Sequence, residues 1–278
     1  MNTTTDIVWL QDDLRIADNP LFHFTDTPSH LLCLYVVDEK WLAPLIEGES
    51  TPRMGPARLR FLWQSLMELR GELLQRGSDL LVRVGKPSKV VIELAASLNA
   101  RQVRVAEHPG VEERAHIQSV IASLPSETSV QCMESGRLFD RQALPFEQTA
   151  LPDSFSAFRR SVEQVCVVPE NRSAPVTLPS WPDAPRGFPP LKAVCEQSAT
   201  WQPDNRQGYA YRGGESEAHA RLHDYLWHQQ GAQTYKKTRN GLLGANFSTR
   251  VSPWLARGCL SARQVYAAVK AWEEENGS

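Results

Sequence analysis

The chain has 278 residues, of which 41% are hydrophobic, so it can bury a large core and whole-chain disorder is excluded. Its 30 Lys and Arg against 32 Asp and Glu give a net charge of -2, which excludes a protein coated in basic charge for non-specific nucleic-acid binding. The charge is uneven, because residues 206–278 carry ten basic and six acidic side chains. We therefore expect an anionic partner to prefer this C-terminal part.

Cysteine usage and the first residues indicate the compartment. The five cysteines are odd in number and far apart, and no C-x-x-C pair suggests a metal site or a redox motif. The start, MNTTTDIVWLQDD, has no basic segment followed by an apolar one, and no apolar run approaches the roughly 20 residues of a membrane helix. We expect a reduced, soluble, cytoplasmic protein that binds no metal and does not contact a membrane.

Residues 4–135 alternate short apolar runs with helical patterns, which predicts an α/β domain. Its fold is expected to be a doubly wound, five-stranded parallel sheet. The expected strands are 6–10, 30–38, 79–85, 102–107 and 130–135, and the expected helices are 56–75, 87–98 and 111–124. Such a sheet binds its ligand beyond the carboxyl ends of its strands. The segment after the first strand lacks the G-x-G-x-x-G turn of a classical dinucleotide fold.

Residues 136–205 are predicted to be an interdomain linker, because proline dominates from Pro169 to Pro203 and no periodic pattern is present. Residues 206–278 then read as the start of a helical domain, with helices expected at 216–228 and 261–272. Two or three helices bury little surface by themselves. They are therefore expected to dock on the first domain or to belong to something longer.

The stretch from Tyr235 to Ser261 is a glycine-punctuated basic loop that runs into a helix. Ser252 suits an N-cap and Pro253 a first helical residue, so the N–H groups after Ser252 are expected to be unpaired and to bind phosphate. The hydroxyls of Ser248, Thr249 and Ser252, with Arg250 among them, suit a pyrophosphate. A capped helix with a solvated polar loop is the alternative interpretation.

Three segments carry a resemblance to the photolyase/cryptochrome family. YKKTRNGLLGANFSTRVSPWLARGC (235–259) is similar to the flavin-binding segment of its DASH cryptochrome branch, and GGESEAHARLHDYLW (213–227) resembles the helix before it. IVWLQDDLRIADNPLF (7–22) resembles the N-terminal signature, from which it departs at Gln11 and Asp12. The resemblance spans essentially the whole chain.

The resemblance implies an N-terminal antenna domain followed by an all-α domain that holds FAD. The residues that match the flavin-diphosphate contacts of the family are Tyr235, Ser248, Thr249, Arg250, Val251 and Ser252. Arg239 matches a position that contacts the DNA backbone in repair members. An ion pair of Arg239 with Glu215 or Glu217 is the structural alternative.

The resemblance also implies an antenna chromophore, which in many DASH members is a folate, 5,10-methenyltetrahydrofolate. The family contact follows the fourth strand and falls at His108, with Glu107 adjacent. A deazaflavin or no antenna at all are alternatives. A histidine at a strand end is also commonly a hydrogen-bonded surface residue.

For the full-length protein, the resemblance implies a monomeric lyase of the deoxyribodipyrimidine photolyase type. It would repair cyclobutane pyrimidine dimers in single-stranded DNA by photoinduced electron transfer. Most of the flavin pocket and the catalytic residues are expected beyond Ser278, so we expect this chain to be C-terminally incomplete, inactive by itself and weak in retaining flavin. The alternatives are a blue-light photoreceptor without repair activity and a stand-alone nucleotide-binding α/β remnant.

Overall fold

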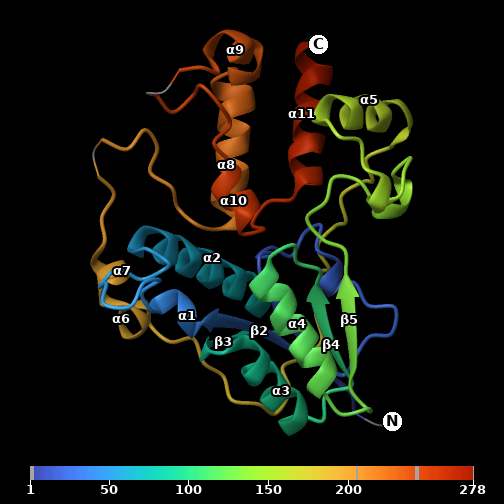
Figure 1. Ribbon diagram of the computed structural model, residues 1–278, viewed down its shortest axis with the longest axis vertical. Helices are drawn as coiled ribbons and strands as arrows, with labels where there is room; N and C mark the ends of the chain where they lie inside the picture. Colours follow the sequence, from blue (N-terminus) through green and yellow to red (C-terminus); the bar gives the residue numbers. More distant parts are fainter. Residues whose placement is uncertain (1–2, 205, 242–243, 278) are drawn as a thin grey trace.

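The computed structural model describes residues 3–204, 206–241 and 244–277 (Figure 1). The strands are β1 (Thr5–Leu10), β2 (His30–Asp38), β3 (Leu80–Gly85), β4 (Gln102–Ala106) and β5 (Ser129–Met133). The α-helices are α1 (Glu39–Leu42), α2 (Pro56–Gln75), α3 (Pro87–Ser97), α4 (Val111–Ser123), α5 (Phe155–Val165), α6 (Leu191–Val194), α7 (Glu196–Thr200), α8 (Glu215–His223), α9 (Gly231–Thr238), α10 (Ser252–Ala256) and α11 (Ala262–Asn276). Three short 3-10 helices, η1 (Pro20–Phe22), η2 (Arg141–Ala143) and η3 (Gln148–Ala150), and a π-helix, η4 (Asp224–His228), complete the described elements. Ser278, and Leu242 and Leu243 of the TRNGLLGA motif, lie outside the described residues.

The five strands form one parallel sheet in the order β3-β2-β1-β4-β5, which confirms the predicted α/β fold. The limits of β2 are as predicted, and no limit of the other strands differs from its prediction by more than two residues. β4 and β5 end earlier than predicted because Ala106 and Met133 form their last pair. From Glu107 onward, the chain is free to place side chains at the carboxyl edge of the sheet.

Alternation along the strands produces two cores, one on each face of the sheet. Val8, Leu10 and Tyr35 belong to the core that includes α2, and Ile7 and Trp9 to the one that includes α3 and α4. Helices therefore cover both faces, as βαβ crossovers require (Figure 1). The long helix α2 begins at Pro56 as predicted, since a proline at the first position loses no hydrogen bond.

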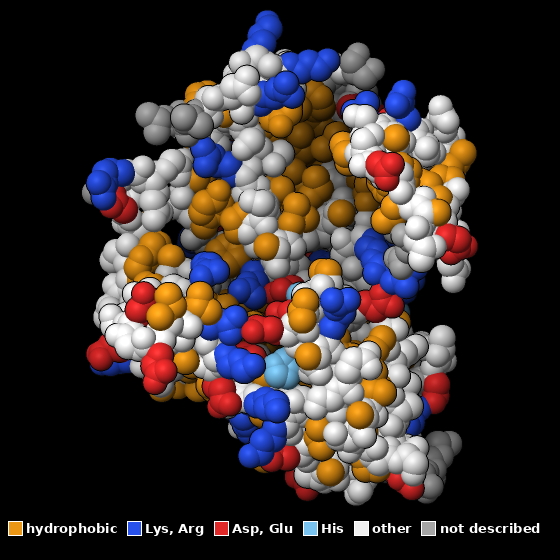
Figure 2. Space-filling view, in the orientation of Figure 1, with side chains coloured by type: hydrophobic (Ala, Val, Ile, Leu, Met, Phe, Trp, Pro, Cys, Tyr) orange, Lys and Arg blue, Asp and Glu red, His pale blue; other side chains and the backbone are white. Residues whose placement is uncertain are grey.

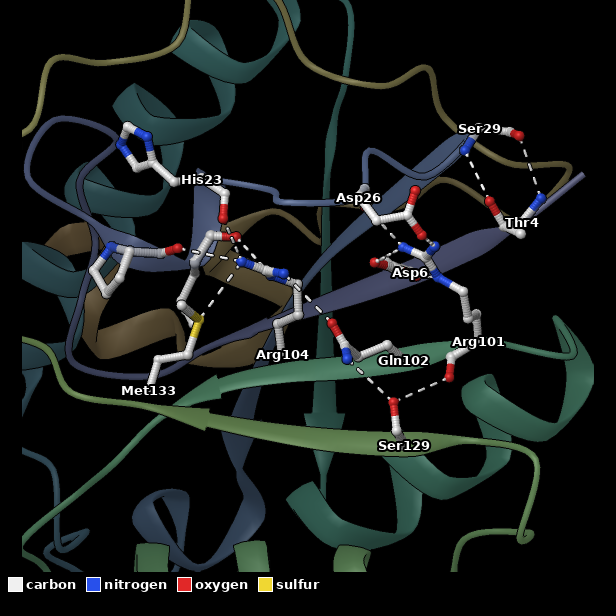
Figure 3. A network of polar contacts seen from close by, with 12 residues as sticks. Thr4, Asp6, His23, Asp26, Ser29, Arg101, Gln102, Arg104, Ser129 and Met133 are labelled. Atoms are coloured by element: carbon white, nitrogen blue, oxygen red, sulfur yellow. Dashed lines mark hydrogen bonds and ion pairs between the residues drawn. The ribbon is translucent and has the colours of Figure 1, made fainter.

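Arg101 and Arg104, three residues apart in the sequence, hold the loop before β2 against the sheet (Figure 3). Arg104 is 4% exposed and donates hydrogen bonds to the carbonyl oxygens of Leu21 (3.0 Å) and His23 (2.7 Å). Arg101 donates to both carboxylate oxygens of the buried Asp6, each at 2.9 Å. These contacts hold the amino end of the sheet and leave the carboxyl end for a ligand.

The proline-rich segment lies along the sheet. The N–H of Leu31 donates to the carbonyl oxygen of Ser180 and that of Val82 to Gly187, each at 2.9 Å. The segment thereby covers the outer strand β3, whose unpaired edge would otherwise invite association. It also contains α6 and α7, two helices too short for sequence periodicity to reveal.

The helices α8–α11 lie above the carboxyl end of the sheet (Figure 1). The helix expected at 216–228 is α8 followed without a break by η4, a π-helical turn. The apolar Ala220 of this helix is exposed, whereas the neighbouring Arg221 is buried. The buried stripe of α8 is therefore Ala218, Arg221 and Leu222.

The last helix begins with a capping box. The Ser261 hydroxyl accepts the N–H of Gln264, and the Gln264 side chain accepts the N–H of Ser261. α11 therefore begins at Ala262 and continues to Asn276, four residues beyond the predicted end at Trp272. Within the described ranges, no helix has the length and apolar character needed to cross a membrane.

Candidate functional site

Four of the predicted cofactor-binding residues lie in the loop before α10, and a fifth, Ser252, is the first residue of that helix. The predicted helix start is wrong by one residue: Val251 is the N-cap, and Ser252 makes no side-chain capping bond. Furthermore, the N–H groups of Trp254 and Leu255 both donate to the Val251 carbonyl oxygen at 3.1 Å. The amides expected after Ser252 are therefore occupied inside the helix, because Pro253 has no N–H and the next two close the first turn.

A different set of backbone donors is open in the same loop. Arg250 has a positive φ of 56°, and Val251 follows with φ -82° and ψ -2°. Successive residues of opposite handedness turn their N–H groups toward one point and form a concavity that binds anions. The N–H groups of Arg250, Val251 and Ser252 have no acceptor among the described residues. Three converging donors suit one phosphate group.

Three hydroxyl side chains belong to this concavity or stand next to it in the sequence. The side chains of Ser248, Thr249 and Ser252 make no hydrogen bond to any residue in the described ranges, so their donors and acceptors are free. The Arg250 guanidinium donates to the carbonyl oxygen of Gly244, and its buried Nε has no partner among the residues that the structure describes. The donor set is neutral hydroxyls and amides beside one cation, a combination typical of diphosphate sites.

Arg250 also lines a cavity of about 750 Å³ between the sheet domain, the linker and α10. Aromatic and basic side chains dominate its wall. They are Trp41, Phe61, Trp201, Tyr209, Tyr211, Arg53, Arg58, Arg250 and Arg257. Aromatic faces with guanidinium groups favour a flat, anionic ligand of about nucleotide size. Figure 2 shows basic side chains gathered near the middle of this face of the molecule, below a hollow lined with hydrophobic side chains.

A second cavity, of about 780 Å³, contains the predicted antenna residues Glu107 and His108. Leu255 and Ala256 of α10 line it from the other part of the chain. The Glu107 carboxylate accepts a hydrogen bond from Arg137 at 2.9 Å and another from Arg141. The charge of Glu107 is therefore balanced by two arginines. A ligand at this site would meet a hydrogen-bond acceptor and not an unpaired negative charge.

Asp12 lines both cavities and connects the two parts of the chain. Its carboxylate lies 2.8 Å from the Arg257 guanidinium and 3.1 Å from His108 Nε2. Burial opposes ionisation of Asp12, but the bonds to His108 and Arg257 outweigh it and lower the pKa below its ordinary value. The hydrogen bond to Asp12 raises the pKa of His108, aided by the carboxylate of Glu113. Asp12, where the sequence departs from the family signature, thus joins the sheet part of the chain to Arg257 at the end of α10.

The ion pair of His108 with Asp12 makes stability depend on pH. The folded pKa of His108 is raised above its ordinary 6.5, so its stabilisation is complete below that pH and is lost as pH rises through the folded value. We expect His108→Gln to lower the free energy of unfolding by about 1 kcal/mol near pH 5.5 and by less near pH 9, as measured by thermal unfolding.

His219→Gln is the matched control for this measurement. Burial lowers the pKa of His219, so its protonation opposes folding and the sign is reversed. The His219 variant should gain stability relative to the parent as pH falls. A loss of stability in His108→Gln that is equal at both ends of the pH range would contradict the role of the ion pair between His108 and Asp12.

Tyr235 and Arg239 lie outside the loop, on α9 and just after it. Both side chains are exposed to solvent. The alternative ion pairs of Arg239 are not present in the described part of the chain, since Glu217 lies 3.4 Å from Arg212 and Glu215 accepts the N–H of Ile16. Arg239 is therefore available to an external anion.

Sequence reasoning missed the Asp12 link and the buried Arg221 beneath the loop. Arg221 had a recognisable signal, because it stands three residues from Ala218 and one from Leu222, on the apolar stripe of a predicted helix. A charged residue at such a position requires partners inside the protein. For Asp12, the sequence offered only one signal, which is its departure from the family signature.

Comparison with known proteins defines the class. Residues 6–180 match the sequence pattern of the family described as DNA photolyase, so the chain belongs to this family. Among its relatives are cryptochrome DASH proteins: that of Danio rerio is 36% identical over 276 residues, and that of Gloeobacter violaceus is 35% identical. Each alignment covers 98% of this chain, and 53% and 54% of the two relatives.

A solved structure gives the same result. The cryptochrome of Synechocystis sp. PCC6803 superimposes with a TM-score of 0.89 at 31% identity, covering all of this chain and 58% of that one. The chain therefore spans about half the length of the relatives that it matches, with the fold maintained throughout.

Proposed function

We propose that this chain supplies the antenna-type domain and the diphosphate-binding loop of a light-dependent FAD flavoprotein. The observation that carries this proposal is the set of three open N–H groups at Arg250, Val251 and Ser252, in a segment that also carries the hydroxyls of Ser248 and Thr249. These donors fit a diphosphate, and they occupy the positions that match the flavin-diphosphate contacts of the family. Tyr235 is assigned to the same cofactor by the resemblance alone.

When bound, FAD supplies light-driven electron transfer, which no side chain can provide. The chain's own residues bind and orient it: the amides and hydroxyls hold the diphosphate, and Trp254 fixes α10 behind the loop. Trp254 is fully buried, and its indole N–H donates to the Arg212 carbonyl oxygen at 2.9 Å. A rigid support of this kind keeps the loop donors in place before the ligand arrives.

Competition binding tests the site. We expect inorganic pyrophosphate to displace FAD from the chain, measured by flavin fluorescence, and riboflavin, which lacks phosphate, to compete poorly. The double variant Ser248→Ala/Thr249→Val should weaken both phosphate ligands about tenfold through lost hydrogen bonds.

Ser97→Ala, a surface hydroxyl at the end of α3, is the control and should leave both affinities unchanged. FAD binding that pyrophosphate does not affect would disprove the diphosphate assignment. The fluorescence titration also measures how much flavin this chain retains, for which we propose weak binding.

For the whole protein, we propose repair of cyclobutane pyrimidine dimers in single-stranded DNA. Arg239 supports this proposal, because it is exposed next to Lys236 and Lys237 and can contact a phosphate backbone. The second candidate, a blue-light receptor without repair, needs the same flavin loop. Loss of dimers from an irradiated oligonucleotide under blue light, or its absence, distinguishes the two with the full-length protein.

We further propose that the cavity at Glu107 and His108 holds the antenna, with 5,10-methenyltetrahydrofolate as the first ligand to test. Its volume of about 780 Å³ is adequate for a pterin with part of its tail. A deazaflavin is the alternative and would suit the aromatic cavity beside Trp41. Absorbance titration with each chromophore, in the parent and in Glu107→Gln, separates these possibilities.

A further inference from the structure

Arg221 is a buried cation directly beneath the proposed diphosphate loop. It is 3% exposed, and its guanidinium lies 5.0 Å from the ring centre of Tyr209 and 5.6 Å from that of Tyr225. A charge taken out of water in this way is tolerated only when all of its donors are satisfied.

All five N–H donors of Arg221 have acceptors, and most acceptors belong to the loop. Three are backbone carbonyl oxygens of residues 245–249, and a fourth is the side chain of a residue between them. The bonds are Nε to Thr249 (2.9 Å), Nη2 to Ala245 (2.7 Å) and Ser248 (3.1 Å), and Nη1 to the Asn246 amide oxygen (3.2 Å) and the Asp224 carboxylate (3.0 Å). The loop is therefore folded around the guanidinium.

This arrangement decides which way the loop amides face. In a trans peptide the carbonyl and the following N–H point in opposite directions. Because the Ser248 and Thr249 carbonyls turn inward to Arg221, the N–H groups of Thr249 and Arg250 turn outward. The Arg250 N–H is the first of the three donors of the anion-binding concavity.

We infer that Arg221 is the positioning residue of the diphosphate site: its guanidinium fixes the loop carbonyls inward and thereby presents the backbone N–H groups to the ligand. The inference rests on the proposed function for the identity of the ligand. Its single carboxylate partner, Asp224, is partly exposed, so the buried cation also leaves positive potential beneath the loop. A lysine cannot replace it, because one ammonium has three donors and no planar fork.

Two measurements on the intact chain test this role: hydrogen exchange of residues 244–252 and calorimetric binding of inorganic pyrophosphate. Arg221→Met should speed exchange in this loop and weaken pyrophosphate about tenfold or more, while the sheet amides stay protected. Arg221→Lys, which keeps the charge, should restore part of the affinity and little of the protection.

Leu222→Ala is the matched control, because Leu222 is equally buried on the same helix and faces the core. It should lower the unfolding temperature without changing loop exchange or pyrophosphate affinity. If Arg221→Met does not fold, the Lys variant and Asn246→Ala, which removes one acceptor, carry the same comparison.

Loop exchange that is the same in the Arg221 variants and in Leu222→Ala would overturn the inference. The proposed function fails separately, when the parent chain itself binds no pyrophosphate. The protection of residues 244–252 from hydrogen exchange would then still show whether Arg221 holds the loop carbonyls. The failure of the inference and the failure of the proposed function are therefore distinguishable.

Discussion

Replacing Gly258 by alanine is expected to separate the helical part of the chain from the sheet domain. Gly258 has φ +64°, and a Cβ there would lie 2.2 Å from the Asp12 carbonyl oxygen and 2.4 Å from the Asp13 Cα. Both neighbours are backbone atoms, which cannot move aside as a side chain can. We expect a loss of more than about 4 kcal/mol in the free energy that docks the two parts.

The clash falls at a point where backbone and buried side-chain hydrogen bonds join the two parts. The N–H of Leu14 donates to the Arg257 carbonyl oxygen at 3.1 Å, and the buried Arg15 donates to that of Gly258 at 2.9 Å. Limited proteolysis should therefore cut residues 206–277 rapidly in Gly258→Ala, while residues 4–135 stay resistant. Unchanged resistance of both parts would contradict the prediction.

Gly71→Ala is the control substitution, because nothing lies within 4 Å of a Cβ at this position of α2. Alanine is the better helix former, so this variant should be more stable by about 1 kcal/mol. The contrast between two glycine-to-alanine changes separates a backbone clash from a general response to added volume.

The sheet could be predicted from the sequence because each strand carries its own signal. β2 is nearly all apolar, as expected of a strand that is buried on both faces. The helix α2 begins at Pro56, and Gly77 follows its C-cap. The strand order and the covering of β3 by the proline-rich segment could not be predicted. They depend on backbone bonds, such as that from Val82 to Gly187, which have no residue-type signature.

The loop residues of the candidate site were predicted from the sequence, but the backbone geometry on which the proposed anion site rests was not. Ser252 and Pro253 indicated a free helix end, whereas the open donors come from the left-handed conformation of Arg250. Non-glycine residues in this conformation are uncommon, and sequence gives no sign of them. Here the conformation is accompanied by bonds from Arg221 to Thr249 and Ser248, which lie 28 and 27 residues further along the chain.

Substitution at Arg250 distinguishes the backbone from the side chain as the source of anion binding. Arg250→Val should weaken pyrophosphate by about 100-fold or more. A β-branched residue disfavours φ +56°, so the three N–H groups no longer converge, and each hydrogen bond to a charged ligand is worth about 1.5–3 kcal/mol. Titration calorimetry on the intact chain measures the affinity.

Arg250→Gly is the matched variant, since glycine adopts the same φ without strain and only the guanidinium is lost. Because that group is already bonded to the Gly244 carbonyl oxygen, its loss should cost no more than about 1 kcal/mol, or about fivefold in affinity. Equal weakening in the two variants would assign binding to the guanidinium and contradict the backbone site. A large difference between them would mean that the conformation of one residue, supported by Arg221, determines whether this loop can hold a diphosphate.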